Sequence, residues 1–144
     1  MGKKRIITKK GQRLDKSLKS RALARLPKKK LATGTLHVQS TFNNTIVLLS
    51  DAEGNAIVSS SSGALGFKGA KKGTPFAAAK VGEVVGEKAA LIGVKEVNVV
   101  VKGVGAGRES AIRSFFSKGI DITRIQDKTA IPHNGCRARK ARRV

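Results

Sequence analysis

The chain has 144 residues, enough for one domain with its own core, and 30 Lys and Arg against nine Asp and Glu give it a net charge of +21. A charge of this size favours a polyanionic partner, with nucleic acid first. The longest apolar runs fall far short of the roughly 20 residues that span a bilayer, so we expect no membrane association, and the lone Cys136 cannot form an internal disulfide.

The charge is unevenly distributed along the chain. Residues 1–34 carry 13 basic side chains and one acidic, residues 35–102 carry seven and five, and residues 103–144 carry ten and three. This distribution predicts a basic N-terminal arm at 1–34, a mixed α/β core at 35–131 and a basic C-terminal tail at 132–144.

The N-terminal arm is dense in cations. It has too few large apolar side chains to build a core against its own repulsion, so alone we expect it to be disordered, with a short amphipathic helix over Lys16–Leu26 on contact with RNA or protein. A solvated tail that only helps solubility is the alternative, but so many cations with one acid favour phosphate binding. The arm's candidate RNA-binding residues are Lys3, Lys4, Arg5, Lys28, Lys29 and Lys30.

The first half of the core has the pattern of antiparallel strands. Thr35–Ser40 alternates polar and apolar residues, and Thr45–Ser50 is β-branched and apolar, so the two predict a hairpin. The residues Asp51–Asn55 are typical of a turn, and Ala56–Ser60 is the third expected strand.

The second half alternates helices and strands. A helix is expected from Thr74, an N-cap residue followed by proline, to about Gly93. The segment Val97–Val101 is expected to be a strand that is apolar on both faces, as the interior of a sheet requires. A second helix over Arg108–Lys118 and a strand over Ile120–Ile125 complete the core.

This order of elements predicts a single α/β domain with a mixed five-stranded sheet and two helices. Right-handed crossovers make the last strands parallel, while the hairpins make the first antiparallel. The arrangement resembles the ribonuclease H fold, whose hydrolysis needs several carboxylates around two metal ions. The first strand has none, and Asp51, Glu53 and Glu96 fall at turns, so we expect no enzyme and no catalytic residue. One cysteine and two histidines do not supply the ligands of a zinc site, and we expect no metal and no cofactor.

Two glycine-rich loops are candidate phosphate sites. The loop Gly66–Gly73 has three lysines on flexible backbone, Lys68, Lys71 and Lys72. A solvated surface loop is the alternative interpretation. In Gly103–Gly107, bare amides, a helix dipole and Arg108 could bind an RNA phosphate, with a structural turn as the alternative. This loop resembles a dinucleotide fingerprint, but Arg108 stands where the third glycine belongs. A nucleotide-binding enzyme is therefore kept as an alternative function.

Aromatic side chains are few. The chain has five Phe and neither Tyr nor Trp. Modules that bind single-stranded RNA by sequence stack bases on aromatic rings, so we expect this protein to bind folded RNA by its shape and backbone. Phe76 and Phe115 lie on the two expected helices and are assigned to the core.

Six short motifs are specific enough to compare with known families. They are TFNNT at 41–45, GFKG at 66–69, TPFAA at 74–78, VKG at 101–103, GRE at 107–109 and IPHNGCR at 131–137. Together they resemble the bacterial form of the small-subunit ribosomal protein S11 family. Family members often have prolines where Val104 and Ala106 stand and a proline pair at Ala138-Arg139, so this tail should be less stiff.

The resemblance implies a structural role in the small ribosomal subunit, on the platform near the mRNA exit and the Shine-Dalgarno region. The implied partners are 16S-type ribosomal RNA, mRNA near the exit, and the neighbouring small-subunit proteins six, seven and eighteen. The implied location is a cytoplasmic ribosome, with an organellar ribosome as the second choice. A general nucleic-acid condensing protein, which would not prefer ribosomal RNA to DNA, is a further alternative.

The candidate RNA-binding residues of the core and the tail follow from these loops, from the tail's charge and from the motifs. His133 and Asn134 are the best candidates for direct hydrogen bonds to RNA, and Asn134-Gly135 is a sequence prone to isoaspartate formation. The full set is Asn43, Asn44, Lys68, Lys71, Lys72, Arg108, Arg113, His133, Asn134, Gly135, Arg137, Arg139, Lys140, Arg142 and Arg143.

Overall fold

Five strands form one sheet in the order β3-β2-β1-β4-β5 in the computed structural model, which describes residues 30–141. The pairs β1–β2 and β2–β3 are antiparallel, and the pairs β1–β4 and β4–β5 are parallel, so the expected mixed five-stranded sheet is confirmed. The strands are β1 (Thr33–Ser40), β2 (Thr45–Ser50), β3 (Ala56–Ser61), β4 (Glu96–Lys102) and β5 (Asp121–Asp127).

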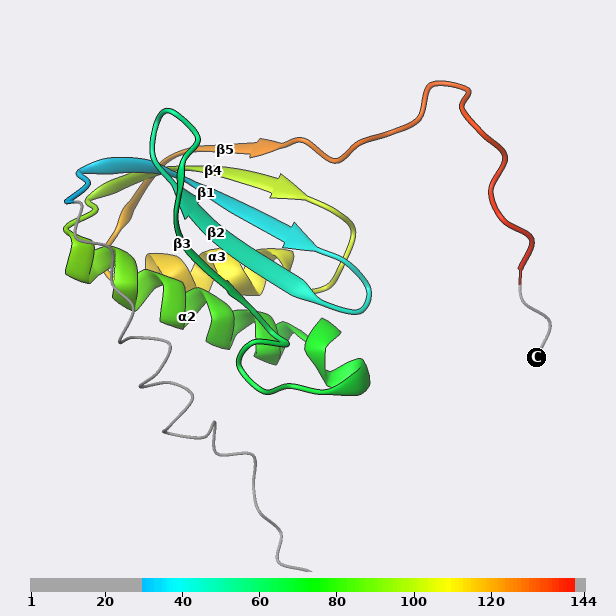
Figure 1. Cartoon of the computed structure of the whole chain (residues 1–144), viewed down its shortest axis with the longest axis horizontal. Helices are drawn as coiled ribbons and strands as arrows, with labels where there is room; N and C mark the ends of the chain where they lie inside the picture. The colour runs from blue at the N-terminus through cyan, green and yellow to red at the C-terminus, as the bar shows by residue number, and fades with distance from the viewer. Residues whose placement is uncertain (1–29, 142–144) are drawn as a thin grey trace, which may run out of the picture.

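Both α-helices, α2 (Pro75–Ile92) and α3 (Arg108–Phe116), lie on the same face of the sheet (Figure 1). The helix α3 ends two residues before the expected Lys118, and a short 3-10 helix, η1 (Gly69–Gly73), forms inside the expected basic loop. The core lies between the sheet and the helices, and the opposite face of the sheet has no helix over it among the described residues.

The expectation that the fourth strand is buried on both faces is wrong in part. Val97, Val99 and Val101 face the helices and belong to the core. On the other face, Asn98 is exposed, while Val100 is 8% exposed because its strand neighbours shield it. A run of valines therefore does not distinguish a strand covered by two layers from one covered by a single layer.

The start and the end of α2 follow the sequence signals. The Ala77 backbone N–H donates to Thr74 Oγ1 at 3.3 Å, Pro75 occupies the first helical position, and Gly93 ends the helix with a φ of 95°. Glycine also sets the helix packing, because a Cβ added at Gly82 would lie 2.3 Å from the Ala111 carbonyl oxygen. The small residue lets α2 and α3 approach closely.

The two helical phenylalanines have different environments. Phe115 is fully buried, as expected, but Phe76 is 57% exposed, so its assignment to the core is wrong. Phe76 lies in the first turn of α2, where the buried face begins only at Ala77. Its ring meets Phe67 edge-on at 6.1 Å between centroids, and the Lys80 ammonium lies 5.8 Å from its centre.

Candidate nucleic-acid interface

Three connections meet at one end of the sheet, because β1, β4 and β5 are parallel and their carboxyl ends lie together (Figure 1). The turn 41–44 follows β1, the loop 103–107 follows β4, and residues 128–131 lead from β5 into the C-terminal tail. We call this the carboxyl end of the sheet. It contains most of the candidate RNA-binding residues of the core.

The turn after β1 is held by one threonine. The Thr41 hydroxyl donates to the Asn44 carbonyl oxygen and accepts from the Asn44 backbone N–H, each at 3.1 Å. Phe42 is 79% exposed and Asn43 is exposed, whereas Asn44 is half-buried. The Asn44 Oδ1 atom is buried and has no hydrogen-bond partner among residues 30–141.

The basic loop Gly66–Gly73 lies against this turn. A Cβ added at Gly73 would be 2.2 Å from the Phe42 carbonyl oxygen, so η1 packs directly on the turn backbone. Lys68 and Lys71 are exposed and Lys72 is half-buried, while the Thr74 hydroxyl donates to the Lys71 carbonyl oxygen at 2.7 Å. The structure therefore brings the lysines and Asn43 to the same end of the molecule.

The glycines after β4 pack against the hairpin of β1 and β2. A Cβ added at Gly103, whose φ is 96°, would lie 2.1 Å from the Ser40 carbonyl oxygen, and one at Gly107 would lie 2.5 Å from Thr45 Oγ1. The Gly105 backbone N–H already donates to the Ser40 carbonyl oxygen at 3.0 Å. These glycines serve close packing, and the Gly105 amide is not free for a pyrophosphate.

Arg108 contacts its own chain. One guanidinium nitrogen donates to the Gly103 carbonyl oxygen at 2.8 Å, and the other forms an ion pair with Asp127. Asp127 also accepts hydrogen bonds from the Thr129 hydroxyl and backbone N–H, and these bonds together with Arg108 lower the pKa of Asp127 to about 2. The Thr129 hydroxyl in turn accepts from the Gly103 backbone N–H at 3.2 Å. This network fastens the start of the tail to the loop.

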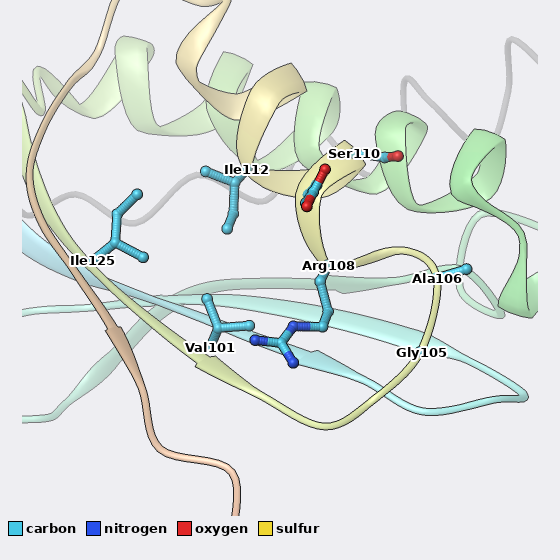
Figure 2. Close-up of a pocket in the computed structure, with 8 residues that line it drawn as sticks. Val101, Gly105, Ala106, Arg108, Ser110, Ile112 and Ile125 are labelled. Carbon is cyan, nitrogen blue, oxygen red and sulfur yellow. The ribbon is translucent and has the colours of Figure 1, made fainter.

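A groove runs between α3 and β5, beside this network (Figure 2). It begins at Arg108 with a volume of about 560 Å³ and continues as an apolar hollow of about 420 Å³. Phe116 and Ile125 in the groove are 54% and 60% exposed. Arg113 also lines the hollow, on the outer side of α3, and so lies apart from the candidates at the carboxyl end of the sheet.

The tail extends away from the domain without regular secondary structure (Figure 1). Asn134 has a positive φ of 56°, a conformation that asparagine tolerates better than most residues. The candidates of the tail that the structure describes are all exposed, namely His133, Asn134, Gly135, Arg137, Arg139 and Lys140.

Some candidates lie elsewhere. Lys30 is exposed just before β1, at the opposite end of the sheet from the loops. The possible helix over Lys16–Leu26 falls outside the described residues, as do the candidates Lys3, Lys4, Arg5, Lys28, Lys29, Arg142 and Arg143.

Basic residues that sequence reasoning missed lie on the uncovered face of the sheet. Lys102, Arg124 and Lys128 are all exposed. The pKa of the half-buried His37 on this face is lowered by burial and by the charges of Lys102 and Lys128. The alternation of residues between the two faces of β4 and β5 could have revealed these basic residues, if it had been known that helices cover only one face of the sheet.

Metal centres and membrane spans are two further classes of site. Between residues 30 and 141, no group of three or more His, Cys, Asp or Glu side chains is placed to hold a metal ion. No helix in the same range is both long and apolar enough to cross a membrane.

A small α/β core with basic loops at one sheet end and a basic extended tail is typical of nucleic-acid-binding proteins. Residues 34–143 match the family model described as ribosomal protein S11. The chain is also 59% identical over 111 residues to "Small ribosomal subunit protein uS11c" of Cyanidioschyzon merolae (strain NIES-3377 / 10D), covering 77% of this chain and 92% of the relative. The chain belongs to the ribosomal protein S11 family, and it is a structural constituent of the small ribosomal subunit.

Proposed function

We propose that this protein binds the 16S-type RNA of the small ribosomal subunit through the carboxyl end of its sheet and its basic tails. The proposed place is the platform, near the mRNA exit and the Shine-Dalgarno region. The observation that carries the proposal is the meeting of the turn 41–44, the lysines of η1 and the start of the basic tail at one end of the fold.

The side chains at this end suit folded RNA. Lys68 and Lys71 are exposed cations for phosphates, and the exposed Asn43 offers an amide to ribose or base edges. Phe42 projects from the turn with 79% of its surface exposed, which suits stacking on an unpaired base. His133 and Asn134 add hydrogen-bonding groups on the tail, whose cations neutralise further phosphates. The protein would thus stabilise RNA structure by charge neutralisation.

Arg108 has a different role in this proposal. Its guanidinium is paired with Asp127 and with the Gly103 carbonyl oxygen, so its first function is to hold the loop and the tail in place. The side chain keeps 31% of its surface exposed, and it can contact a phosphate from that position. The remaining candidates, which are Arg113 and the basic residues of the N-terminal arm, stay proposed phosphate contacts.

The groove between α3 and β5 suits contact with a neighbouring protein. Apolar side chains such as Phe116 and Ile125 gain by leaving water but offer nothing to phosphate. We assign this groove to contact with a neighbouring platform protein, among the small-subunit proteins six, seven and eighteen. The mRNA near the exit is a further proposed partner of the basic tails.

A cytoplasmic ribosome is the proposed location. Cys136 is an exposed free thiol, which is in keeping with a reducing compartment. Separation of the host's ribosomes by compartment, followed by peptide mapping, distinguishes this location from an organellar ribosome.

The alternative functions have less support. A nucleotide-binding enzyme needs free backbone amides in the loop 103–107. Here the Gly105 N–H already donates to the Ser40 carbonyl oxygen, and atoms of the β1–β2 hairpin occupy the space beside the glycines. A general condensing protein requires only charge, whereas here an ordered turn and loop are built at one end of a fold. Equal affinity for ribosomal RNA and for duplex DNA would favour the condensing protein.

Filter binding of the full chain to small-subunit ribosomal RNA tests the proposal. We expect the logarithm of the association constant to fall linearly with the logarithm of salt concentration, by about 0.9 for each phosphate contact on duplex-like RNA or about 0.7 on single strands. The triple variant Arg137→Gln, Arg139→Gln and Lys140→Gln should lower this slope by about 2 to 3. A flat salt response of the unmodified protein would overturn the proposal.

A further inference from the structure

The uncovered face of the sheet has an ordered arrangement of polar side chains. The strand registers pair Thr35 with Asn98 and Asn98 with Arg124, which forms one row across β1, β4 and β5. His37, Val100 and Gln126 form the next row, about 6.6 Å further along the strands. The last row, at the carboxyl end of the sheet, consists of Gln39, Lys102 and Lys128.

Lys102 and Lys128 are neighbours in this last row. The Lys128 backbone N–H donates to the Val101 carbonyl oxygen at 2.9 Å, so Lys128 continues β5 directly beside Lys102. Like charges side by side on adjacent strands repel each other and lower the stability of the free protein. Neither ammonium has an ion pair within the described part of the chain, and both charges act on His37. A bound anion would remove this repulsion.

The two faces of the domain differ in how their charges are balanced. On the helix side, Lys80 is paired with Glu83 at 2.9 Å, and Lys118 is paired with Glu87 at 3.2 Å. On the uncovered face, the Arg124 guanidinium donates to the amide oxygen of Gln126, at 2.7 and 3.1 Å in the amide orientation that satisfies both groups. Arg124 on the uncovered face thus has a neutral neighbour, whereas Lys80 and Lys118 on the helix side have carboxylates.

Among residues 30–141, the acidic groups of this face lie at the end where β4 and β5 begin, with Glu96 paired to Asp121 in the register. A hollow of about 360 Å³ extends from His37 and Lys128 to the β2–β3 turn, where Asp51 and Glu53 line it. Asp51 accepts hydrogen bonds from the backbone N–H groups of Glu53 and Asn55, at 3.1 and 2.9 Å, so its carboxylate serves the turn. The positive end is therefore the one at Lys102 and Lys128, which adjoins the carboxyl end of the sheet.

We propose that the uncovered face of the sheet is a second RNA-binding surface, on which Lys102, Arg124 and Lys128 bind backbone phosphates. The amides of Gln39, Asn98 and Gln126 lie in the same rows and can hydrogen-bond to ribose hydroxyls, which distinguish RNA from DNA. This inference rests on the proposed ribosomal RNA binding and extends it from the loops and tails to the sheet itself. The RNA would continue from the carboxyl end of the sheet across β5, β4 and β1.

Filter binding with charge-matched variants of the full chain tests this surface. The face variant combines Lys102→Gln, Arg124→Gln and Lys128→Gln, and the control variant combines three substitutions at the helix side and the amino end of β4: Lys80→Gln, Lys95→Gln and Lys118→Gln. Both variants lose three positive charges. We expect the salt slope on small-subunit ribosomal RNA to fall by about 2 to 3 in the face variant and by less than about 0.5 in the control.

The outcomes separate this inference from the proposed function. Equal slopes in the face and control variants, with a steep slope in the unmodified protein, would overturn the sheet surface and leave RNA binding by the loops and tails intact. A flat slope in the unmodified protein would overturn both. The double variant Lys102→Arg and Lys128→Arg keeps the charges and should keep the slope and the affinity, and a tenfold loss of affinity in that variant would contradict phosphate binding at these positions.

Discussion

At the scale of single residues, Gly103 shows how a position can imitate a ligand site. Glycines before a helix are typical of phosphate loops, and the sequence left a phosphate site and a structural turn both open. The structure gives Gly103 a packing role, because its φ is 96° and the space where a Cβ would stand is occupied by the Ser40 carbonyl oxygen, 2.1 Å away.

Gly103→Ala should therefore be more destabilising than the cost of a positive φ alone predicts. Gly54→Ala is a matched control, since Gly54 has a φ of 92° but nothing within 4 Å of an added Cβ. We expect Gly54→Ala to lower the free energy of unfolding by about 1 to 2 kcal/mol, the cost of a left-handed alanine. Gly103→Ala should cost a further 1 to 3 kcal/mol or so from overpacking, as measured by urea denaturation. Equal losses in the two variants would show that the packing contact is unimportant.

At the scale of elements, Asp127 joins parts that are far apart in the sequence. It ends β5, binds Arg108 at the start of α3, and accepts hydrogen bonds from Thr129 at the start of the tail. Thr129 closes the network on Gly103 after β4. The exit direction of the tail therefore depends on one carboxylate.

Asp127→Asn should make this part of the fold less dependent on pH. The folded-state pKa of about 2 lies below the unfolded value of about 4, so ionised Asp127 contributes stability that is present above pH 4 or so and is lost as the pH falls toward about 2. The difference in urea midpoint between the unmodified protein and Asp127→Asn should be constant from about pH 5 to 7 and shrink below about pH 4. Thr129→Ala removes one donor to the carboxylate and should show part of the same effect. A difference that stays constant down to about pH 2.5 would contradict this role of Asp127.

Most elements could be predicted from local signals. Thr74, Pro75 and Gly93 mark the two ends of α2, and alternating residues mark β1. The side of the sheet on which the helices lie could not be predicted, because the valines of β4 suit either one or two covering layers. That missing choice also hid the basic face, since Lys102 and Arg124 become neighbours of one surface only when the parallel register of β4 and β5 is known.

The candidate site could be predicted only as a set of separate segments. The sequence pointed to the lysines of η1, the turn at Asn43 and the tail, but their meeting at one sheet end depends on contacts such as that of Gly73 with Phe42. Local charge also could not reveal that Arg108 is paired with Asp127, 19 residues further along the chain. Long-range pairing is decided by the fold and not by the motif.

At the scale of the whole molecule, the surfaces of the domain differ in how many exposed cations they carry. Exposed cations gather at the carboxyl end of the sheet, on its uncovered face and along the tail, whereas Lys80 and Lys118 on the helix side are paired with carboxylates. Under the proposed function, this arrangement orients the domain so that RNA lies on the side of the loops and the uncovered face, and the groove at Phe116 and Ile125 is left for a protein neighbour. The central claim is that the unpaired cations lie against RNA in the small subunit.

Acetylation of lysines in the free protein and in the assembled small subunit, read by mass spectrometry, tests that claim most directly. Assembly should protect the lysines of the loop, the uncovered face and the tail at least about tenfold more than those of the helix side, because a bound phosphate shields the ammonium from the reagent. The first group is Lys68, Lys71, Lys102, Lys128 and Lys140, and the second is Lys80 and Lys118, which are paired with carboxylates. Equal protection of the two groups, or stronger protection of the helix side, would contradict the account.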